Sequence, residues 1–182
     1  MCGIFGLVSG KWQSQAESAA QLQSHRGPDD FGVYNKHPLA LIHYRLSILD
    51  LSANGHQPMF SQDDRFVIIF NGEIYNHLEI RKQFSDHHFK TNSDTETILH
   101  AYTKEGTSVF KKLNGIFAIA IFDNKENQLI LARDQLGVKP LYYHQSASGF
   151  VFSSELKSIA SLNGIDQSYQ SNKTRHDSHK HR

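Results

Sequence analysis

The chain has 182 residues, of which 38% are hydrophobic and 20% are charged, with a net charge of +1. This length suits one domain with a sizeable core, and the near-zero net charge excludes a protein that attracts nucleic acid or a membrane surface through a basic balance. No apolar run reaches the ~18 residues of a membrane span, no signal-peptide pattern is present, and the single cysteine excludes an internal disulfide, so we expect a cytoplasmic protein.

The only cysteine, Cys2, lies directly after Met1 and before an apolar run that predicts a strand. We expect aminopeptidase to remove Met1, because the second residue is small. Cys2 would then carry both a thiol and a free α-amine, which is one of the known nucleophile–base pairs. The alternative is that a lone cysteine is a small buried hydrophobe, and position alone does not decide between them.

Further along the chain, periodicity and turn residues predict a series of short elements. We expect helices over residues 16–24, 76–84, from Ser93 and from about 155, and strands over 39–43, 46–51, 65–70, 115–123, 128–133, 141–144 and 150–153. Ser93 and Glu96 fit a capping box at the start of the third helix. Short turns join most strands, which favours antiparallel sheets, and helices fall between runs of strands. The sequence therefore predicts an α+β fold with helices layered against sheet faces.

Three polar positions lie where these strands and helices begin or end. Arg45 follows an apolar strand, and its planar guanidinium suits the capture of a carboxylate, although a surface ion pair is the commoner role of an arginine. Asn71 and Gly72 end the most apolar strand and could form an oxyanion hole, or equally a plain Asn-Gly hairpin turn. Asp94 lies in the first turn of a helix, where the helix dipole alone explains an acidic residue.

The histidines and glycines predict no metal or nucleotide site. Twelve histidines are scattered without a metal-ligand spacing or a cysteine partner, so we expect neither a structural nor a catalytic metal. The chain also lacks a glycine-rich phosphate loop, and we therefore expect no cofactor in this chain.

Six motifs in one order resemble the class II glutamine amidotransferase domain, and more narrowly the glutaminase domain of glutamine-hydrolysing asparagine synthetase. They are Met1-Cys-Gly-Ile, Ser24-His-Arg-Gly-Pro-Asp-Asp30, Tyr44-Arg-Leu-Ser-Ile-Leu-Asp50, Asn71-Gly-Glu-Ile-Tyr-Asn76, Ser93-Asp-Thr-Glu96 and Ala132-Arg-Asp-Gln-Leu-Gly-Val-Lys-Pro-Leu-Tyr142. The resemblance covers residues 2 to about 160. It implies the N-terminal-nucleophile fold, a four-layer αββα sandwich with two antiparallel sheets.

The resemblance also implies the catalytic roles. Cys2 would attack the side-chain amide of L-glutamine and form a thioester, while Asn71 and Gly72 would stabilise the oxyanion. Water would then release glutamate, so the chain is expected to be a glutaminase that provides ammonia for the ATP-dependent amidation of aspartate.

The substrate contacts follow from the same resemblance. Arg45 would hold the α-carboxylate of glutamine, Asp94 with help from Glu73 would hold the α-ammonium, and Leu46 and Ile48 would complete the binding site. Opposite charges at the two ends select a free amino acid over a peptide or a simple amide. This clamp argues against an amidohydrolase that acts on another amide.

The family's ATP-dependent synthetase domain is not expected in this chain. We assign residues 2–165 to the glutaminase domain and 166–182 to a disordered, basic, His-rich tail. ATP and magnesium would be needed only by a synthetase domain, which would act in cis or in trans. Two explanations stay open: a frameshifted or truncated chain, or a stand-alone glutaminase. An inactive remnant or a partner-dependent or regulatory module is the alternative function.

Overall fold

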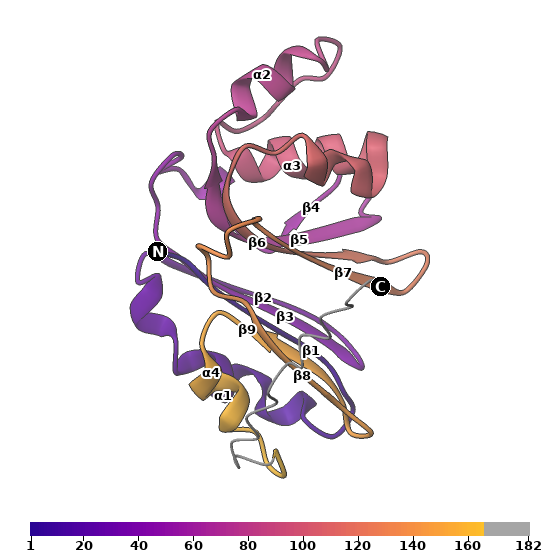
Figure 1. Cartoon of the computed structure of the whole chain (residues 1–182). Helices are drawn as coiled ribbons and strands as arrows, with labels where there is room; N and C mark the ends of the chain where they lie inside the picture. The colour runs from indigo at the N-terminus through magenta and orange to yellow at the C-terminus, as the bar shows by residue number, and fades with distance from the viewer. Residues whose placement is uncertain (166–182) are drawn as a thin grey trace, which may run out of the picture.

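The computed structural model describes residues 1–165, and these residues form two antiparallel sheets that pack face to face. One sheet has the order β2-β3-β1-β9-β8 and the other β4-β5-β6-β7. Helices α1 and α4 cover the outer face of the first sheet, and α2 and α3 that of the second (Figure 1). The predicted α+β class and the four-layer αββα arrangement are therefore confirmed, while the predicted tail over 166–182 lies outside the described residues.

The elements have the following bounds. The strands are β1 Gly3–Val8, β2 Asp30–Lys36, β3 Leu39–Arg45, β4 Met59–Phe60, β5 Phe66–Ile74, β6 Gly115–Asp123, β7 Gln128–Arg133, β8 Tyr142–Ser146 and β9 Gly149–Ser153. The helices are α1 Ala16–Gln21, α2 His77–Lys82, α3 Asp94–Glu105 and α4 Leu156–Ala160, with 3-10 turns at Gln13–Gln15, Ser24–Arg26, Ala53–Gly55 and Gly106–Lys111. Within residues 1–165, no helix has both the length and the hydropathy to cross a membrane.

Strand alternation divides the core into three layers, which β6 illustrates. Its large residues Phe117, Ile119 and Ile121 pack toward α3, whereas the small Ala118 and Ala120 face the other sheet. Successive side chains of a strand point to opposite faces, so one strand contributes to two cores. The predicted bounds of β6 and β7 are confirmed to the residue.

Strand β1 lies at the centre of its sheet, between β3 and β9. Phe5 pairs with Ser153 of β9, so the first strand pairs with the last strand of the described residues. Gly6 makes room for this arrangement, because a Cβ there would lie 2.4 Å from the ring of Phe152. Phe152 is fully buried in the layer between the sheets.

One polar contact links the two sheets through this layer. The ring Nε2 of His43, on β3, lies 3.1 Å from the carbonyl oxygen of Phe70, on β5. His43 is fully buried, and this burial lowers its pKa from 6.5 to about 3, so the ring is neutral and Nε2–H donates to the carbonyl. The contact fixes the backbone of β5 directly before Asn71.

The structure corrects two sequence predictions and adds two strands. Residues 46–51 are not a strand: β3 continues to Arg45, and a loop follows in which Ile48 and Leu51 are exposed. Strand β5 does not end before Asn71 but continues to Ile74, and Asn71 pairs with Ala118, which excludes the hairpin turn. Strands β2 and β4 were not predicted.

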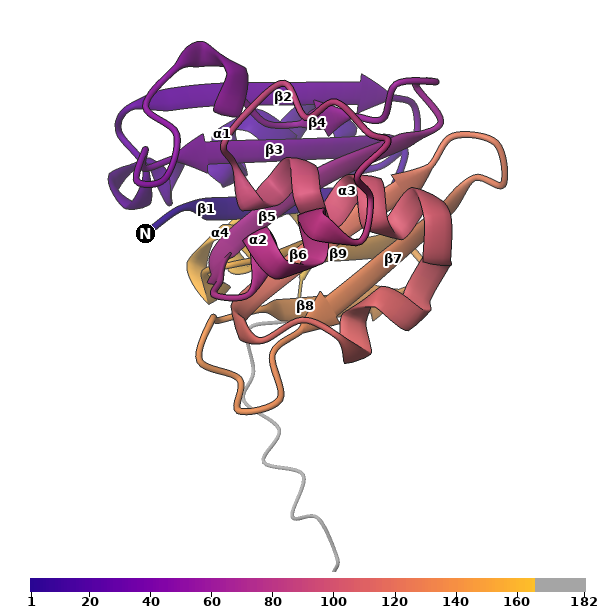
Figure 2. The ribbon, with the colours of Figure 1, turned by 90° about the horizontal axis from the view of Figure 1, so that it is seen from above.

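Helix α3 begins as predicted, with one difference. The Ser93 hydroxyl accepts a hydrogen bond from the Thr95 N–H at 3.0 Å, as an N-cap should. The Glu96 carboxylate, however, accepts from the N–H groups of Lys90 and Thr91, at 2.9 and 2.8 Å, rather than from Ser93. The capping box is therefore only half formed, and Glu96 instead fixes the loop before the helix. Figure 2 shows α2 and α3 lying over the sheet that contains β5 and β6.

We predict that Phe152→Ala lowers the free energy of unfolding by about 3–5 kcal/mol, because it leaves a cavity between the sheets. Urea denaturation would measure this loss. The control is Leu136→Ala, whose side chain is 89% exposed and should change the stability by less than about 0.5 kcal/mol. Equal effects of the two substitutions would contradict the assignment of Phe152 to the core.

We predict that His43 makes the protein less stable as the pH falls. The unfolded chain takes up a proton near pH 6.5 and the folded chain only near pH 3, so acid favours unfolding over that window. Between pH 7 and pH 5, the stability of the wild type relative to His43→Gln should fall by about 2 kcal/mol. Urea titrations at both pH values measure it, and parallel pH curves for the two proteins would rule it out.

Candidate active site

The apolar layer between the sheets becomes polar at one end, and the candidate site lies there. Along β1 and the residue before it, the side chains facing this layer change from Ile4 to Cys2. Along β3 they change from Leu41 through His43 to Arg45. Along β5, the side chains facing the layer change from Ile69 to Asn71. These faces follow from the alternation of strands whose apolar members pack between the sheets.

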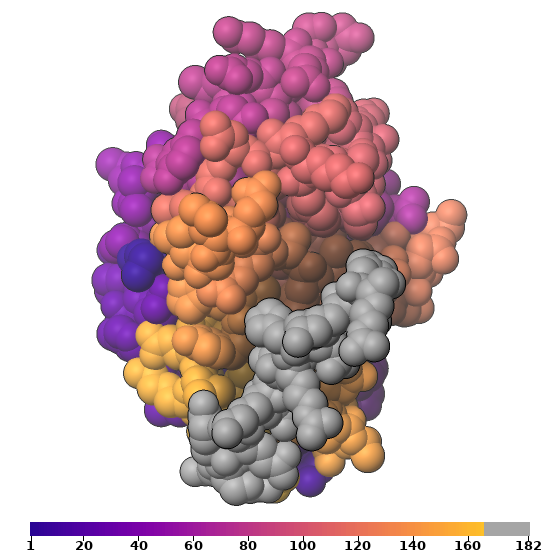
Figure 3. All heavy atoms as spheres, viewed as in Figure 1, coloured from indigo at the N-terminus to yellow at the C-terminus, as the bar shows by residue number. Residues whose placement is uncertain are grey.

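A small cavity lies at this polar end and brings most of the predicted residues together. Its lining includes Cys2, Arg45, Leu46, Ile48, Gly72, Glu73 and Asp94, together with Met1, Leu49, Asp50, Gly55, Gln57, Phe70, Ser93, Thr95 and Lys139. Among the described residues, Asn71 is the one predicted site residue that the lining does not include. The N-terminal end of the chain, in indigo, reaches the surface (Figure 3), and its exposed Met1 belongs to this lining.

The thiol of Cys2 lies against the backbone of Leu46. Its Sγ accepts from the Leu46 N–H at 3.4 Å and lies 3.7 Å from the Leu46 carbonyl oxygen. Burial raises the pKa of the thiol, while the Leu46 backbone and the positive charges of the N-terminus, Arg45 and Lys139 act to lower it. The net shift is upward, so the thiol is protonated at neutral pH and needs a base to become a nucleophile.

The Arg-Gly-Pro-Asp motif positions both Cys2 and the loop that follows β3. The Arg26 Nε donates to the carbonyl oxygen of Cys2 at 3.0 Å, and Glu155 holds the same guanidinium at 3.3 Å. Asp29 bonds to the start of the loop, since its carboxylate accepts from the Ser47 N–H at 2.8 Å. These side chains fix the backbone around the cavity, which itself contains neither Arg26 nor Asp29.

Arg45 is held in place by the loop that follows it. Its Nη1 donates to the carbonyl oxygen of Ser52 at 2.9 Å, and its Nη2 donates to the carbonyl of Asp50. Gly55 lies against the guanidinium, because a Cβ there would be 2.1 Å from Nη2. The side chain is 7% exposed and keeps its positive charge in the cavity, which suits a carboxylate ligand.

The N–H groups of β5 show how Gly72 could act. Phe70 and Ile74 direct their N–H groups away from β6, to the Gln57 side chain at 2.6 Å and to Asp94 at 3.0 Å. Gly72 lies between them, and alternate residues of an antiparallel strand direct their N–H groups the same way. On the other strand, Phe117, the partner of Gly72 in the register, exchanges its own hydrogen bonds with Asp134. The Gly72 N–H is therefore a donor aimed at the cavity side.

The side chain of Asn71 points into the layer between the sheets, on the face of β5 opposite the one that packs against α3. It is 1% exposed, and its side-chain Nδ2 has no hydrogen-bond partner among residues 1–165. An unpaired buried amide donor is costly and rare in native proteins. Such a donor is suited to a partner that forms only during a reaction.

Asp94 forms the other charged end of the cavity. It is 4% exposed, and burial raises its pKa to about 6, although backbone N–H groups, first that of Ile74, act in the opposite direction. The negative charge of Glu73, which lines the same cavity, adds to the upward shift. A cation bound here would offset both the burial and the repulsion from Glu73, and would therefore stabilise the ionised carboxylate.

The lining residues that were not singled out from the sequence include Lys139 and Gln57. Lys139 is 9% exposed and belongs to a loop that Asp134 holds through the N–H groups of Val138 and Lys139, at 2.8 and 3.0 Å. Gln57 joins β5 to α3, because its Nε2 donates to the Thr95 hydroxyl at 3.1 Å while its Oε1 accepts from Phe70. Lys139 was part of a quoted motif, but its role depends on a loop conformation that no local pattern indicates.

Comparisons with known proteins identify the family of the chain. The family model described as a glutamine amidotransferase domain matches residues 1–177. A putative asparagine synthetase [glutamine-hydrolyzing] 2 of Methanocaldococcus jannaschii is 39% identical over 194 residues, covering 95% of this chain and 38% of its own length. The asparagine synthetase [glutamine-hydrolyzing] 3 of Bacillus subtilis is 42% identical over 168 residues, covering 87% of this chain and 27% of its own length.

Solved structures show the same fold. A glutamine phosphoribosylpyrophosphate amidotransferase from B. subtilis has a TM-score of 0.73 at 21% identity and covers 87% of this chain and 43% of its own. A structure titled as the allosteric regulatory enzyme of purine biosynthesis gives 0.74, also at 21% identity, with the same coverage. This chain spans 27% to 38% of the length of the two sequence relatives above. It belongs to the glutamine amidotransferase domain family, and it is homologous to the N-terminal glutaminase part of the glutamine-hydrolysing asparagine synthetases.

Proposed function

We propose that this chain hydrolyses L-glutamine to glutamate and ammonia, with Cys2 as the nucleophile. The observation that carries the proposal is that one cavity is lined by Cys2, by the buried Arg45 and by the buried Asp94. A free amino acid with a side-chain amide has a carboxylate, an ammonium and an electrophilic carbon, and the cavity has a complementary group for each.

The reaction begins with the activation of the thiol. Because burial keeps the Cys2 thiol protonated, a base must remove the proton, and the α-amine of Cys2 serves once Met1 has been removed. The Sγ then bonds to the amide carbon of glutamine, and the carbonyl oxygen becomes negatively charged. The Gly72 N–H and the unpaired Asn71 Nδ2 are the donors proposed for this oxyanion, and one such donor is typically worth about 10²–10³ in rate.

The later steps return the enzyme to its starting state. The proton held by the α-amine passes to the departing nitrogen, so that the C–N bond breaks and ammonia leaves. Water then adds to the thioester carbon, the C–S bond breaks and the proton returns to the sulfur. Throughout, Arg45 holds the α-carboxylate, and Asp94 with Glu73 holds the α-ammonium, while Leu46 and Ile48 line the cavity.

We further propose that the ammonia serves a synthetase domain, in cis or in trans, as the names of the relatives suggest. The residues assigned to the glutaminase domain are 2–165. ATP, magnesium and the acceptor, by default aspartate, would belong to the synthetase domain rather than to this cavity. An inactive or partner-dependent module is the alternative that the first experiment below distinguishes.

We predict that the purified chain releases glutamate from L-glutamine and that Cys2→Ala reduces this release to the level of buffer. Coupled detection of glutamate and ammonia measures turnover, and intact mass establishes the removal of Met1. Release that persists in Cys2→Ala would refute the nucleophile. A folded, Met1-free chain without turnover would favour the partner-dependent module, which the addition of a synthetase domain would then test.

We predict that the KM for glutamine rises about tenfold per pH unit below pH 6. The pKa of Asp94 in the free protein is about 6, so at lower pH its carboxyl group is neutral and no longer pairs with the ammonium. Initial rates across pH 4.5–8 measure this limb of the profile. In Asp94→Asn the KM should be high and flat over the same range; a wild-type limb that survives in Asp94→Asn would assign the titration to another group.

A further inference from the structure

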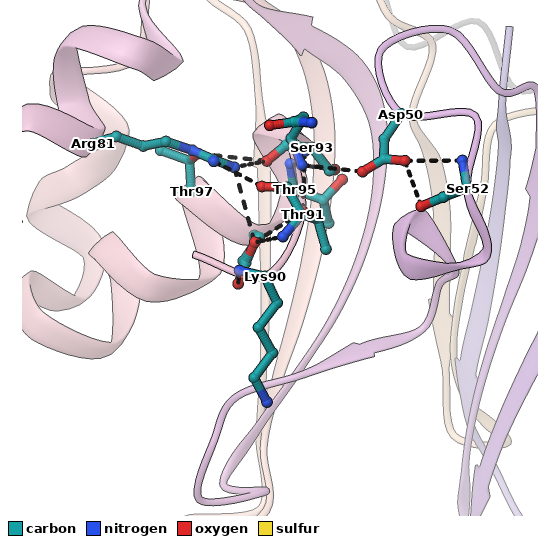
Figure 4. A network of polar contacts seen from close by, with 10 residues as sticks. Asp50, Ser52, Arg81, Lys90, Thr91, Ser93, Thr95 and Thr97 are labelled. Carbon is teal, nitrogen blue, oxygen red and sulfur yellow. Dashed lines mark hydrogen bonds and ion pairs between the residues drawn. The ribbon is translucent and has the colours of Figure 1, made fainter. Parts of the chain in front are cut away.

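We propose that Asp50 is a positioning residue that holds the two charged ends of the glutamine site at a fixed separation. The inference rests on the proposed function, and it assigns a role to an aspartate that the zwitterion clamp itself does not use. Asp50 belongs to the loop between β3 and β4, and Figure 4 shows it facing the loop that precedes α3.

The first part of the argument concerns Arg45. Two carbonyls, those of Asp50 and Ser52, accept hydrogen bonds from its guanidinium. The Asp50 carboxylate fixes the segment that presents them, because its Oδ1 accepts from the Ser52 N–H at 2.9 Å and from the Ser52 hydroxyl at 2.6 Å. The orientation of the guanidinium therefore depends on the Asp50 side chain.

The second part concerns Asp94. The other oxygen of the same carboxylate, Oδ2, accepts from the Asn92 N–H at 3.0 Å. Asn92 lies two residues before Asp94, in the segment 90–93 that leads into the N-cap of α3. One carboxylate oxygen of Asp50 thus bonds to Ser52, whose carbonyl holds Arg45. The other oxygen bonds to Asn92, which lies just before Asp94.

The segment 90–93 is rigid enough to transmit this contact. Arg81, on α2, donates to the carbonyls of Thr91 and Ser93 at 2.8 and 2.6 Å and to the Thr97 hydroxyl at 2.7 Å. The Glu96 carboxylate holds the same segment from α3. A segment fixed from two helices changes its place only as a unit, so the Asp50–Asn92 bond sets its distance from the Arg45 loop (Figure 4).

Charge supports the same role. The Ser52 hydroxyl, followed by the Asn92 and Ser52 N–H groups, lowers the pKa of Asp50, so the carboxylate is ionised at neutral pH and accepts all three bonds. Bonds to an ionised acceptor are shorter and stronger than neutral ones. The Gln57–Thr95 bond is a second link between the same two regions, and Asp50 is the one that also supports Arg45.

The test uses Asp50→Asn, which keeps the shape of the side chain and removes its charge and one acceptor. Rates are measured with L-glutamine, with glutaramate, which lacks the α-amine, and with 4-aminobutanamide, which lacks the α-carboxylate. We expect the KM for glutamine to rise about tenfold while kcat changes much less, the size of losing one hydrogen bond to a charged group. The preference for glutamine over both analogues should shrink together.

Two further variants serve as controls. Asp63→Asn removes a matched carboxylate, which accepts from the Ser61 hydroxyl at 2.6 Å and the Arg65 N–H in the turn before β5, and it should leave both preferences unchanged. Ser52→Ala keeps the Asp50–Asn92 bond, so it should weaken only the preference that depends on the α-carboxylate. It also tests the proposal independently if Asp50→Asn folds poorly.

Several results would overturn the proposal. These are a loss of kcat at constant KM in Asp50→Asn, a change in preference over one analogue alone, or equal behaviour of Asp50→Asn and Asp63→Asn. A wild-type chain that turns over glutamine no better than the analogues would instead refute the proposed zwitterion clamp. The two failures are therefore distinguishable.

Discussion

The packing of the two sheets against each other is the constraint on which the rest of the molecule depends. Along most of the interface the strands present apolar side chains, and at one end the same rows present Cys2, Arg45 and Asn71. Because the side-chain period of a strand is two, a register shift of one residue would turn the apolar residues and the polar residues of the candidate site to the wrong face together. The strand register that packs the core correctly is therefore also the register that orients the side chains of the site. The contact of His43 with β5 lies at the boundary between the two regions.

Burial also shifts the pKa values of the titratable groups of the site. Asp94 and Cys2 both lie in surroundings that disfavour their ionised forms, and burial is the first cause of the upward pKa shift of each. Arg45 and Lys139 bring positive charge to the thiol, and Glu73 brings negative charge to Asp94. The two ends of the cavity, Arg45 and Asp94, are both buried. In the proposed function, a zwitterionic substrate supplies an opposite charge at each end, and an uncharged amide supplies neither.

Elements whose conformation depends on local sequence were predicted correctly. Elements and site residues whose positions depend on tertiary contacts were not. The alternation of β6 and the Ser93 cap of α3 are local, and both were predicted correctly. Residues 46–51 are apolar and were taken for a strand, but Ile48 and Leu49 line the cavity instead of packing in a core. The edge strand β2 was missed because its apolar residues, Phe31, Val33 and Tyr34, do not keep a regular alternation with polar ones. At the site, motifs identified the charged residues, whereas Gln57 and Lys139 acquire their positions only from loops placed by distant partners.

The central position of β1 in its sheet has a consequence for the folding of the chain during its synthesis on the ribosome. Its partner β9 is the last strand of the described chain, so the first sheet cannot be completed until the residues around Ser153 have been synthesised. At about 5–20 residues per second, this interval is on the order of 10–30 s. During it, the N-terminus has no finished sheet to enter and stays open to the enzymes that trim nascent chains. In the proposed function, the order of translation thus gives the removal of Met1 a lead over folding at Cys2.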